Sequence, residues 1–222
     1  MNRSINVLLV FILMPTMLIT IIIGFDLPLT FLKTSGADMP YREEVFLSLG
    51  LLILMINVRR SIRRWVGISM VSKVNKFKWN EPVSLPRKKR VVTYLILEIA
   101  IMAFVAVALY VVSPQAWMPA IGFLFGAVDN VVFTIIGISR DSYRVGLSSR
   151  ALVIADREVI VLYFTGLRKV SQQQQSIYFD YIKGLQMDFP TDCIQEDSRA
   201  EFFKILEAQM DPERVYFSHK MA

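Results

Sequence analysis

The sequence predicts a bundle of four membrane-spanning helices followed by a mostly-β domain, and three observations predict this fold class. Of the 222 residues, 54% are hydrophobic and 20% are charged, which is more apolar than a typical globular chain. The apolar residues form four long blocks, whereas 23 of the last 84 residues are charged. We therefore expect a membrane domain over residues 1–138, with a basic connection at 59–91, and a β-rich domain over residues 139–222.

The first two apolar blocks predict the first two spans, since a helix needs about 20 mainly apolar residues to cross a membrane. Residues 5–25 meet this requirement. Their apolar stretch is longer than that of a signal peptide and no A-x-A site follows it, so we expect a retained anchor. The second span covers about 41–58, and its charged start is expected at the outer interface: Arg42, Glu43 and Glu44.

The third and fourth spans, about 92–112 and 116–138, are separated only by Ser113 to Gln115. They are expected to form an antiparallel hairpin, and a slightly longer turn over 113–119 is equally allowed. Gly122 and Gly126 in the fourth span form a small-xxx-small pattern that permits close helix packing, within the chain or in a dimer.

Two acidic residues, Glu98 and Asp129, lie inside these last two apolar blocks. Carboxylates inside a membrane are costly and by default indicate function. They predict either a proton or cation site or a contact with a basic group on a partner helix. The structural alternative is a protonated carboxyl that hydrogen-bonds a nearby polar side chain: Asn130, Thr134 or Tyr94.

The basic residues predict the orientation of the chain, because Lys and Arg stay on the cytoplasmic side. Segment 59–91 has eleven basic residues and one acid, whereas segment 26–44 has two basic and four acidic residues. Both termini are therefore expected in the cytoplasm.

The basic segment is also a predicted contact surface. Anionic lipid is the first expected partner, an acidic protein is the second, and nucleic acid is not expected, since membrane topology already explains the charge. The residues concerned are Arg59, Arg60, Arg63, Arg64, Trp65, Arg87, Lys88, Lys89 and Arg90.

The residues that catalysis commonly needs are scarce. The only cysteine is Cys193 and the only histidine is His219, so neither an internal disulfide nor a multi-histidine metal centre is expected. Phosphate-binding, dinucleotide-binding and zinc-protease motifs are missing from the sequence. We therefore expect no cofactor, no metal and no enzymatic activity.

Residues 139–222 read as short strands followed by one helix at about 198–210. A hairpin is expected around residues 155–158, and Gln172 to Gln175 are expected to form a polar loop. The predicted strands are 143–147, 151–155, 159–165, 167–170, 176–182 and 185–189.

This order of elements resembles a bacterial pleckstrin-homology-like (PH-like) domain, with the local cue in residues 177–189, IYFDYIKGLQMDF. The resemblance covers about 70 residues. It implies a curved sheet capped by a helix and used for binding, in a protein of the bacterial inner membrane, and it implies no catalytic residues. A six-stranded domain of another topology remains an alternative.

Three functions follow as hypotheses. The first is a non-catalytic anchor for the cytoplasmic domain, acting as a scaffold, assembly factor or accessory subunit of a membrane complex. A protein partner would support it, whereas a bare homo-oligomer would favour the other two hypotheses. The second is a small transporter or ion-coupled subunit that uses Glu98 and Asp129. The third is a membrane-stress or lipid sensor that uses the basic segment.

Overall fold

A computed structural model describes residues 2–28, 35–173, 175–211 and 215–218, with side chains from residue 12 onward other than Lys183. Contacts group the chain into two compact units. The first unit comprises residues 1–62 and 94–133, and the second comprises residues 63–93 and 134–222. The domain boundary after residue 138 stays a prediction.

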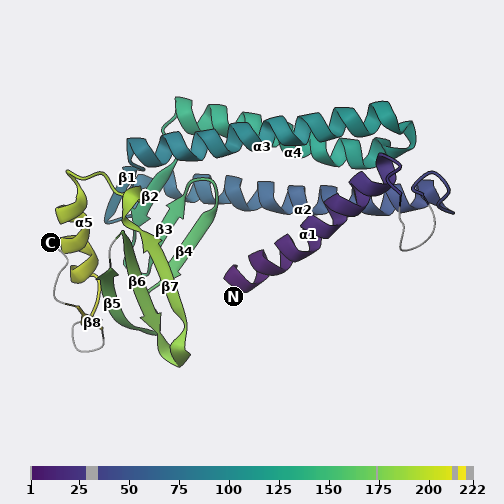
Figure 1. Cartoon of the computed structure of the whole chain (residues 1–222). Coiled ribbons are helices and arrows are strands. Elements are labelled where there is room, and N and C mark those ends of the chain that lie inside the picture. The colour runs from purple at the N-terminus through teal and green to yellow at the C-terminus, as the bar shows by residue number, and fades with distance from the viewer. Residues whose placement is uncertain (1, 29–34, 174, 212–214, 219–222) are drawn as a thin grey trace. The chain divides into compact units, whose positions relative to one another are not determined.

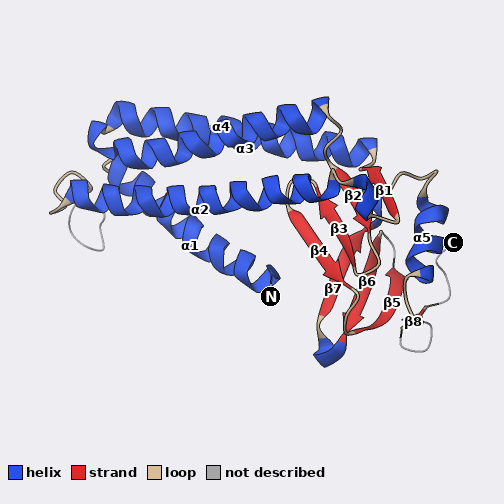
Figure 2. Cartoon of the chain, turned by 180° about the vertical axis from the view of Figure 1, so that it is seen from behind, coloured by secondary structure: helices blue, strands red, loops and turns tan. Residues whose placement is uncertain are grey.

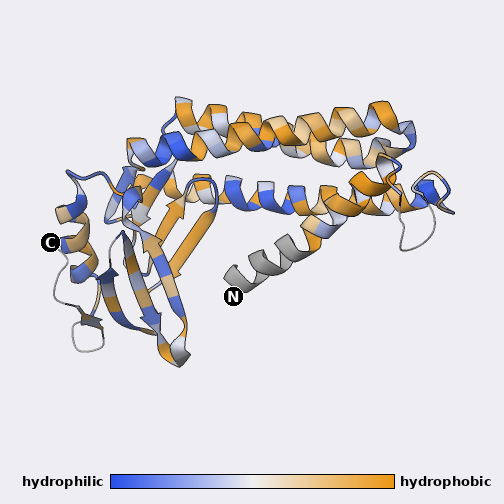
Figure 3. Cartoon of the chain, in the orientation of Figure 1, coloured by the Kyte–Doolittle hydropathy of each residue, from blue (hydrophilic) through white to orange (hydrophobic). Residues whose placement is uncertain are grey.

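Four long helices dominate the first half of the chain (Figure 1). Three of them are long and apolar enough to cross a membrane, namely α2, α3 and the segment Pro114–Ser139 that contains α4. Figure 3 shows their apolar residues in orange, with hydrophilic residues gathered in part of α2 and at the start of α3. The helices are α1 (Asn2–Gly24), α2 (Arg42–Val71), α3 (Leu85–Val112) and α4 (Trp117–Ser139).

The predicted fourth span corresponds to α1. The described apolar part of α1 is Ile12–Gly24, shorter than a span, and the side chains of residues 5–11 lie outside the described residues. A crossing by α1 therefore stays a prediction.

Two helices are longer than the apolar blocks that predicted them. Helix α2 continues through the arginine-rich segment to Val71, and α3 begins at Leu85 instead of about residue 92. The early start of α3 follows from its capping: the Oγ of Ser84 accepts a hydrogen bond from the backbone N–H of Arg87 at 3.3 Å. Pro86, in the first turn, fits a position where no intrahelical N–H bond is needed.

The core of the first unit is formed by apolar side chains from all four helices. Small residues bring α4 close to α2, because a side chain at Gly122 would meet Ile53 and the main-chain oxygen of Gly50. At Gly126 it would meet Asn57 and Met102. The core residues are Ile23, Phe46, Ile53, Met102, Ala106, Leu109, Ala116, Phe123 and Ala127.

The second unit contains two four-stranded sheets and helix α5 (Arg199–Ala208) (Figure 2). The first sheet is antiparallel, in the order β1 (Trp79–Pro82), β2 (Arg144–Leu147), β3 (Ala151–Ala155), β4 (Val159–Tyr163). The second has the order β7 (Gln186–Pro190), β6 (Ser176–Tyr181), β5 (Leu167–Gln173), β8 (Tyr216–Phe217), in which β8 runs parallel to β5.

All six predicted strands, the hairpin at 155–158 and the helix near 198–210 are confirmed. Strands β1 and β8 were not predicted. The predicted polar loop is shorter than expected, because Gln172 and Gln173 belong to β5, where Gln172 pairs with Ile177. Gln175 lies in the turn between β5 and β6, and Gln174 lies outside the described residues. A strand that exposes one face tolerates polar residues, so the first two glutamines did not mark a loop.

Helix α5 packs against one strand of each sheet through Phe202. Its ring lies 5.1 Å from Trp79 of β1, edge to face, and 5.7 Å from Phe189 of β7, stacked. All three side chains are buried. Aromatic pairs of this kind contribute beyond their buried area, by roughly 0.5–1.5 kcal/mol each. The helix thus joins the two sheets.

Candidate functional site

The two intramembrane acids lie in a polar cluster that α2, α3 and α4 form within the first unit. Nη2 of Arg60 donates to Oε2 of Glu98 at 2.7 Å, and Nδ2 of Asn130 donates to the same oxygen at 3.2 Å. The Oγ of Ser61 donates to Oδ1 of Asp129 at 2.7 Å. We call these residues the polar cluster: Arg60, Ser61, Glu98, Asp129 and Asn130.

The helical repeat explains how α2 supplies its share. Asn57 and Ser61 are four residues apart and therefore lie on one face of α2, and both are buried. Asn130 is completely buried, whereas the side chains of Arg60 and Glu98 are 28% and 19% exposed. The ion pair is thus largely removed from solvent.

The cluster contains elements of both sequence interpretations of the acids. Asn130 is bonded to Glu98, as the structural alternative expected. A basic group also contacts Glu98, but Arg60 belongs to α2 of the same chain. Guanidinium and carboxylate balance each other's charge, so removing either one leaves the other uncompensated. A role of Glu98 or Asp129 in carrying an ion stays a prediction.

The other two predicted hydrogen-bond partners of the acids are Thr134 and Tyr94, and a bond from either one to Glu98 or Asp129 stays a prediction. Thr134 belongs to the second unit, where it hydrogen-bonds the buried Tyr143. Burial raises the pKa of the Tyr143 hydroxyl to about 12, so the phenol stays protonated at neutral pH. Tyr94 is nearly half exposed.

Three of the four residues in the basic run 87–90 form ion pairs inside the second unit. Arg87 contacts Asp156 at 2.8 Å and Asp192 at 3.5 Å, and Arg90 contacts Asp192 at 2.8 Å. Lys88 contacts Asp141. Asp156 is buried, so this network fixes the start of α3 to the turn between β3 and β4. Lys89 is exposed and remains a candidate for lipid contact.

The basic residues of α2 are also of two kinds: some are held within the protein, and others keep exposed surface. Arg60 is bonded within the polar cluster, and Arg64 is buried within the protein at 3% exposure. Arg59, Arg63 and Trp65 are half-buried and keep surface that a lipid headgroup can reach. The predicted lipid or partner contact thus has three candidates on this helix.

A second candidate site is a pocket of about 570 Å³ in the second unit. Its lining includes the buried Leu167, Met210 and Val215 and the exposed Arg150 and Arg168. The described lining residues lie at 149–150, 164–168, 182, 209–211 and 215. Sequence reasoning missed this pocket. The only local signal was Gly166, whose positive φ of 81° allows the tight turn between β4 and β5.

Among the described residues, no group of three or more His, Cys, Asp or Glu side chains is arranged to hold a metal ion. Burial raises the pKa of the Cys193 thiol to about 12, so this cysteine is a neutral thiol near pH 7. His219 lies outside the described residues.

Comparison with known proteins found no match for this chain among protein-family models, curated proteins or solved structures.

Proposed function

We propose that this chain is a non-catalytic protein of the bacterial inner membrane whose helices anchor a cytoplasmic, PH-like binding domain. In this proposal it acts as a scaffold, assembly factor or accessory subunit of a membrane complex. Helix α1 is the fourth span, and both termini are cytoplasmic. The 23 residues of α1 correspond to about 35 Å of helix, which is long enough to cross a hydrocarbon core of about 30 Å.

The ion pair between Arg60 and Glu98 is the observation that carries this proposal. A carrier must bind and release its ion, so its carboxylates need a state in which they are available. Here Glu98 is held by Arg60 and Asn130, and Asp129 is held by Ser61. Such bonds between α2, α3 and α4 favour a rigid anchor, because each of the three bonds joins two different helices.

Two features of the second unit support a binding role, namely its sheets with the C-terminal helix and its pocket. Two sheets joined by a C-terminal helix fit the arrangement that the PH-like resemblance implies. The pocket is lined by the two basic residues Arg150 and Arg168, by one acid, Asp211, and by apolar side chains, so it has the chemistry to hold an acidic, partly apolar segment of a partner protein.

The test is site-specific crosslinking in bacterial membranes, followed by native mass spectrometry of the full chain in mild detergent. A photoreactive residue replaces Thr165 in the pocket, and the matched control replaces Lys204, an exposed residue of α5 that does not line it. We expect a hetero-complex of defined stoichiometry, crosslinked from position 165 and not from position 204. A homo-oligomer without any partner would overturn the proposal.

A small ion-coupled transporter is the second candidate, favoured by the placement of two carboxyl groups within apolar helices. It predicts proton-dependent flux in proteoliposomes that Asp129→Asn abolishes while the protein stays folded. Equal flux in the wild type and in this variant would exclude a role for Asp129 in transport.

A further inference from the structure

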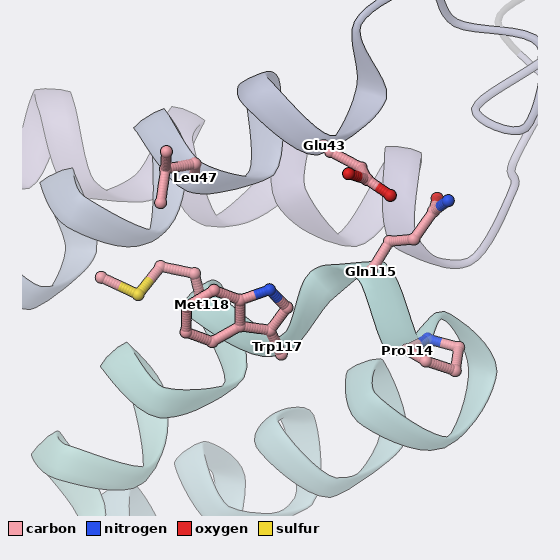
Figure 4. Close-up of a pocket in the computed structure, with 6 residues that line it drawn as sticks. All are labelled: Glu43, Leu47, Pro114, Gln115, Trp117 and Met118. Carbon is pink, nitrogen blue, oxygen red and sulfur yellow. The ribbon is translucent and has the colours of Figure 1, made fainter.

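A pocket of about 320 Å³ lies in the first unit, between the start of α2 and the connection from α3 to α4. The wall on α2 consists of Glu43 and Leu47, as Figure 4 shows. The opposite wall consists of four residues of the connection and of the first turn of α4: Pro114, Gln115, Trp117 and Met118.

The lining is polar at one end and apolar at the other. In Figure 4 the carboxylate of Glu43 points toward the Gln115 side chain, whereas Leu47 and Met118 face each other farther along the helices. The indole of Trp117 lies between these two ends. Glu43 is exposed, and Leu47 and Trp117 are 45% and 50% exposed. A ligand can therefore enter from the surface and reach both ends.

The charge of the pocket is negative. Among the described residues that line it, Glu43 is the only charged one. The neighbouring Arg42 is directed toward other groups, because its Nη2 donates to the main-chain oxygen of Ile23 at 3.2 Å and its guanidinium lies 5.5 Å from the centre of the Phe46 ring. A carboxylate beside an indole is the combination that attracts an ammonium group, by charge and by cation–π interaction.

We propose that this pocket binds the primary ammonium headgroup of an aminophospholipid. The ammonium lies between the Glu43 carboxylate and the Trp117 ring, and Gln115 accepts a further hydrogen bond through its side-chain oxygen. The linker and acyl chain pass over Leu47 and Met118 into the hydrocarbon layer. An exposed tryptophan at the end of a membrane helix fits this depth, since tryptophan is enriched at the membrane interface. The proposal rests on the membrane location of the helices and not on a protein partner.

The chemistry predicts headgroup selectivity. A primary ammonium can donate hydrogen bonds to the carboxylate, whereas the trimethylammonium of a choline lipid has no N–H to donate. A glycerol headgroup carries no cation to balance the phosphate, so this lipid has a net negative charge that Glu43 repels. We therefore expect affinity to fall from ethanolamine to choline to glycerol lipids with the same acyl chains.

The test is native mass spectrometry of the full chain titrated with these three lipids. We expect Glu43→Gln to lower the affinity for the ethanolamine lipid about tenfold and to abolish the preference over the choline lipid. The matched control is Glu44→Gln, which changes an equally exposed neighbour that does not line the pocket, and it should leave both unchanged. Gln115→Leu, in the connection outside the long helices, is a second variant if Glu43→Gln does not fold.

Three outcomes would overturn the proposal: equal binding of the three lipids by the wild type, the same loss in Glu43→Gln and Glu44→Gln, or displacement of the lipid by an equal concentration of free ethanolamine. The last result would assign the pocket to a soluble amine. Because this readout needs only protein and lipid, its failure leaves the scaffold proposal standing, and a missing protein partner leaves the lipid site standing.

Discussion

The Nδ2 of Asn57 on α2 donates a hydrogen bond to the main-chain oxygen of Gly122 on α4, at 3.1 Å. The bond is buried, and one turn farther along α4 a side chain at Gly126 would lie 3.2 Å from the same asparagine. The two glycines of the small-xxx-small pattern thus lie against α2 of their own chain, and the absence of side chains lets an amide reach a helix backbone. A carbonyl in an intact helix has a free lone pair that can accept such a bond.

The first prediction concerns this contact. Gly122→Leu should lower stability by about 1–3 kcal/mol, because the new side chain would collide with Ile53 and with the backbone at Gly50. Thermal unfolding in mild detergent measures the change. Val107→Leu, at a position on α3 that is 61% exposed, is the control and should unfold like the wild type. Equal melting of Gly122→Leu and the control would contradict the packing described.

The second prediction concerns the ion pair of the polar cluster. Arg60→Met should destabilise the protein by about 2–4 kcal/mol, because Glu98 would lose its guanidinium partner in a largely buried site. The double variant Arg60→Met with Glu98→Gln should recover most of that loss. Unfolding in a denaturant series measures the double variant and the two single variants, Arg60→Met and Glu98→Gln, which together form a double-mutant cycle.

Arg59→Met is the matched control for this cycle, since Arg59 is the adjacent, half-buried arginine of the same helix. It should change stability little. If the double variant is as unstable as the sum of the two single variants, Arg60 and Glu98 are not coupled in the folded protein.

The third prediction concerns the start of α3. Arg87→Met should loosen the turn between β3 and β4, because it removes the guanidinium that contacts the buried Asp156. Hydrogen exchange of residues 155–158 should become faster. Lys89→Met, at an exposed position of the same basic run, should leave this exchange unchanged.

The fourth prediction concerns pH. Burial raises the pKa of the Cys193 thiol from its ordinary value of 9.0 to about 12. Above pH 9 the unfolded chain releases this proton while the folded chain retains it, so stability should fall as pH rises from about 9 to 12. The loss attributable to this thiol is at most about 1.4 kcal/mol per pH unit.

Cys193→Ala should show a shallower decline over the same pH range, as measured by the unfolding midpoint at each pH. At neutral pH the wild-type thiol should react with a maleimide only after unfolding, since it is completely buried. Rapid labelling of the folded protein would contradict the burial of Cys193.

The long helices and six of the eight strands could be predicted because their signals are local. A long apolar block predicts a membrane helix, and a short run of β-branched residues between turn residues predicts a strand. Strand β1 carries no such signal in Trp79 to Pro82. It is defined by its partner, since Trp79 pairs with Leu147 and Asn80 is bonded to Arg144. Neither segment alone predicts a pairing between strands that are more than 60 residues apart in the sequence.

The candidate sites also combine residues that a local sequence signal predicts with residues that only the fold brings together. Glu98 and Asp129 stood out because they interrupt apolar blocks. Arg60 did not stand out as the partner of Glu98, since it is one of eleven basic residues in its segment and only the packing of α2 against α3 selects it. Both pockets escaped prediction because their walls come from segments that are distant in the sequence.

The origin of β1 has a consequence for synthesis of the protein. This strand leaves the ribosome before α3 and α4, yet β2, with which it pairs, follows about sixty residues later. At translation rates of about 5–20 residues per second, the strand waits several seconds with its backbone groups unpaired. During that interval α3 and α4 are synthesised. The pairing of β1 with β2 therefore completes the first sheet only after both helices have been made.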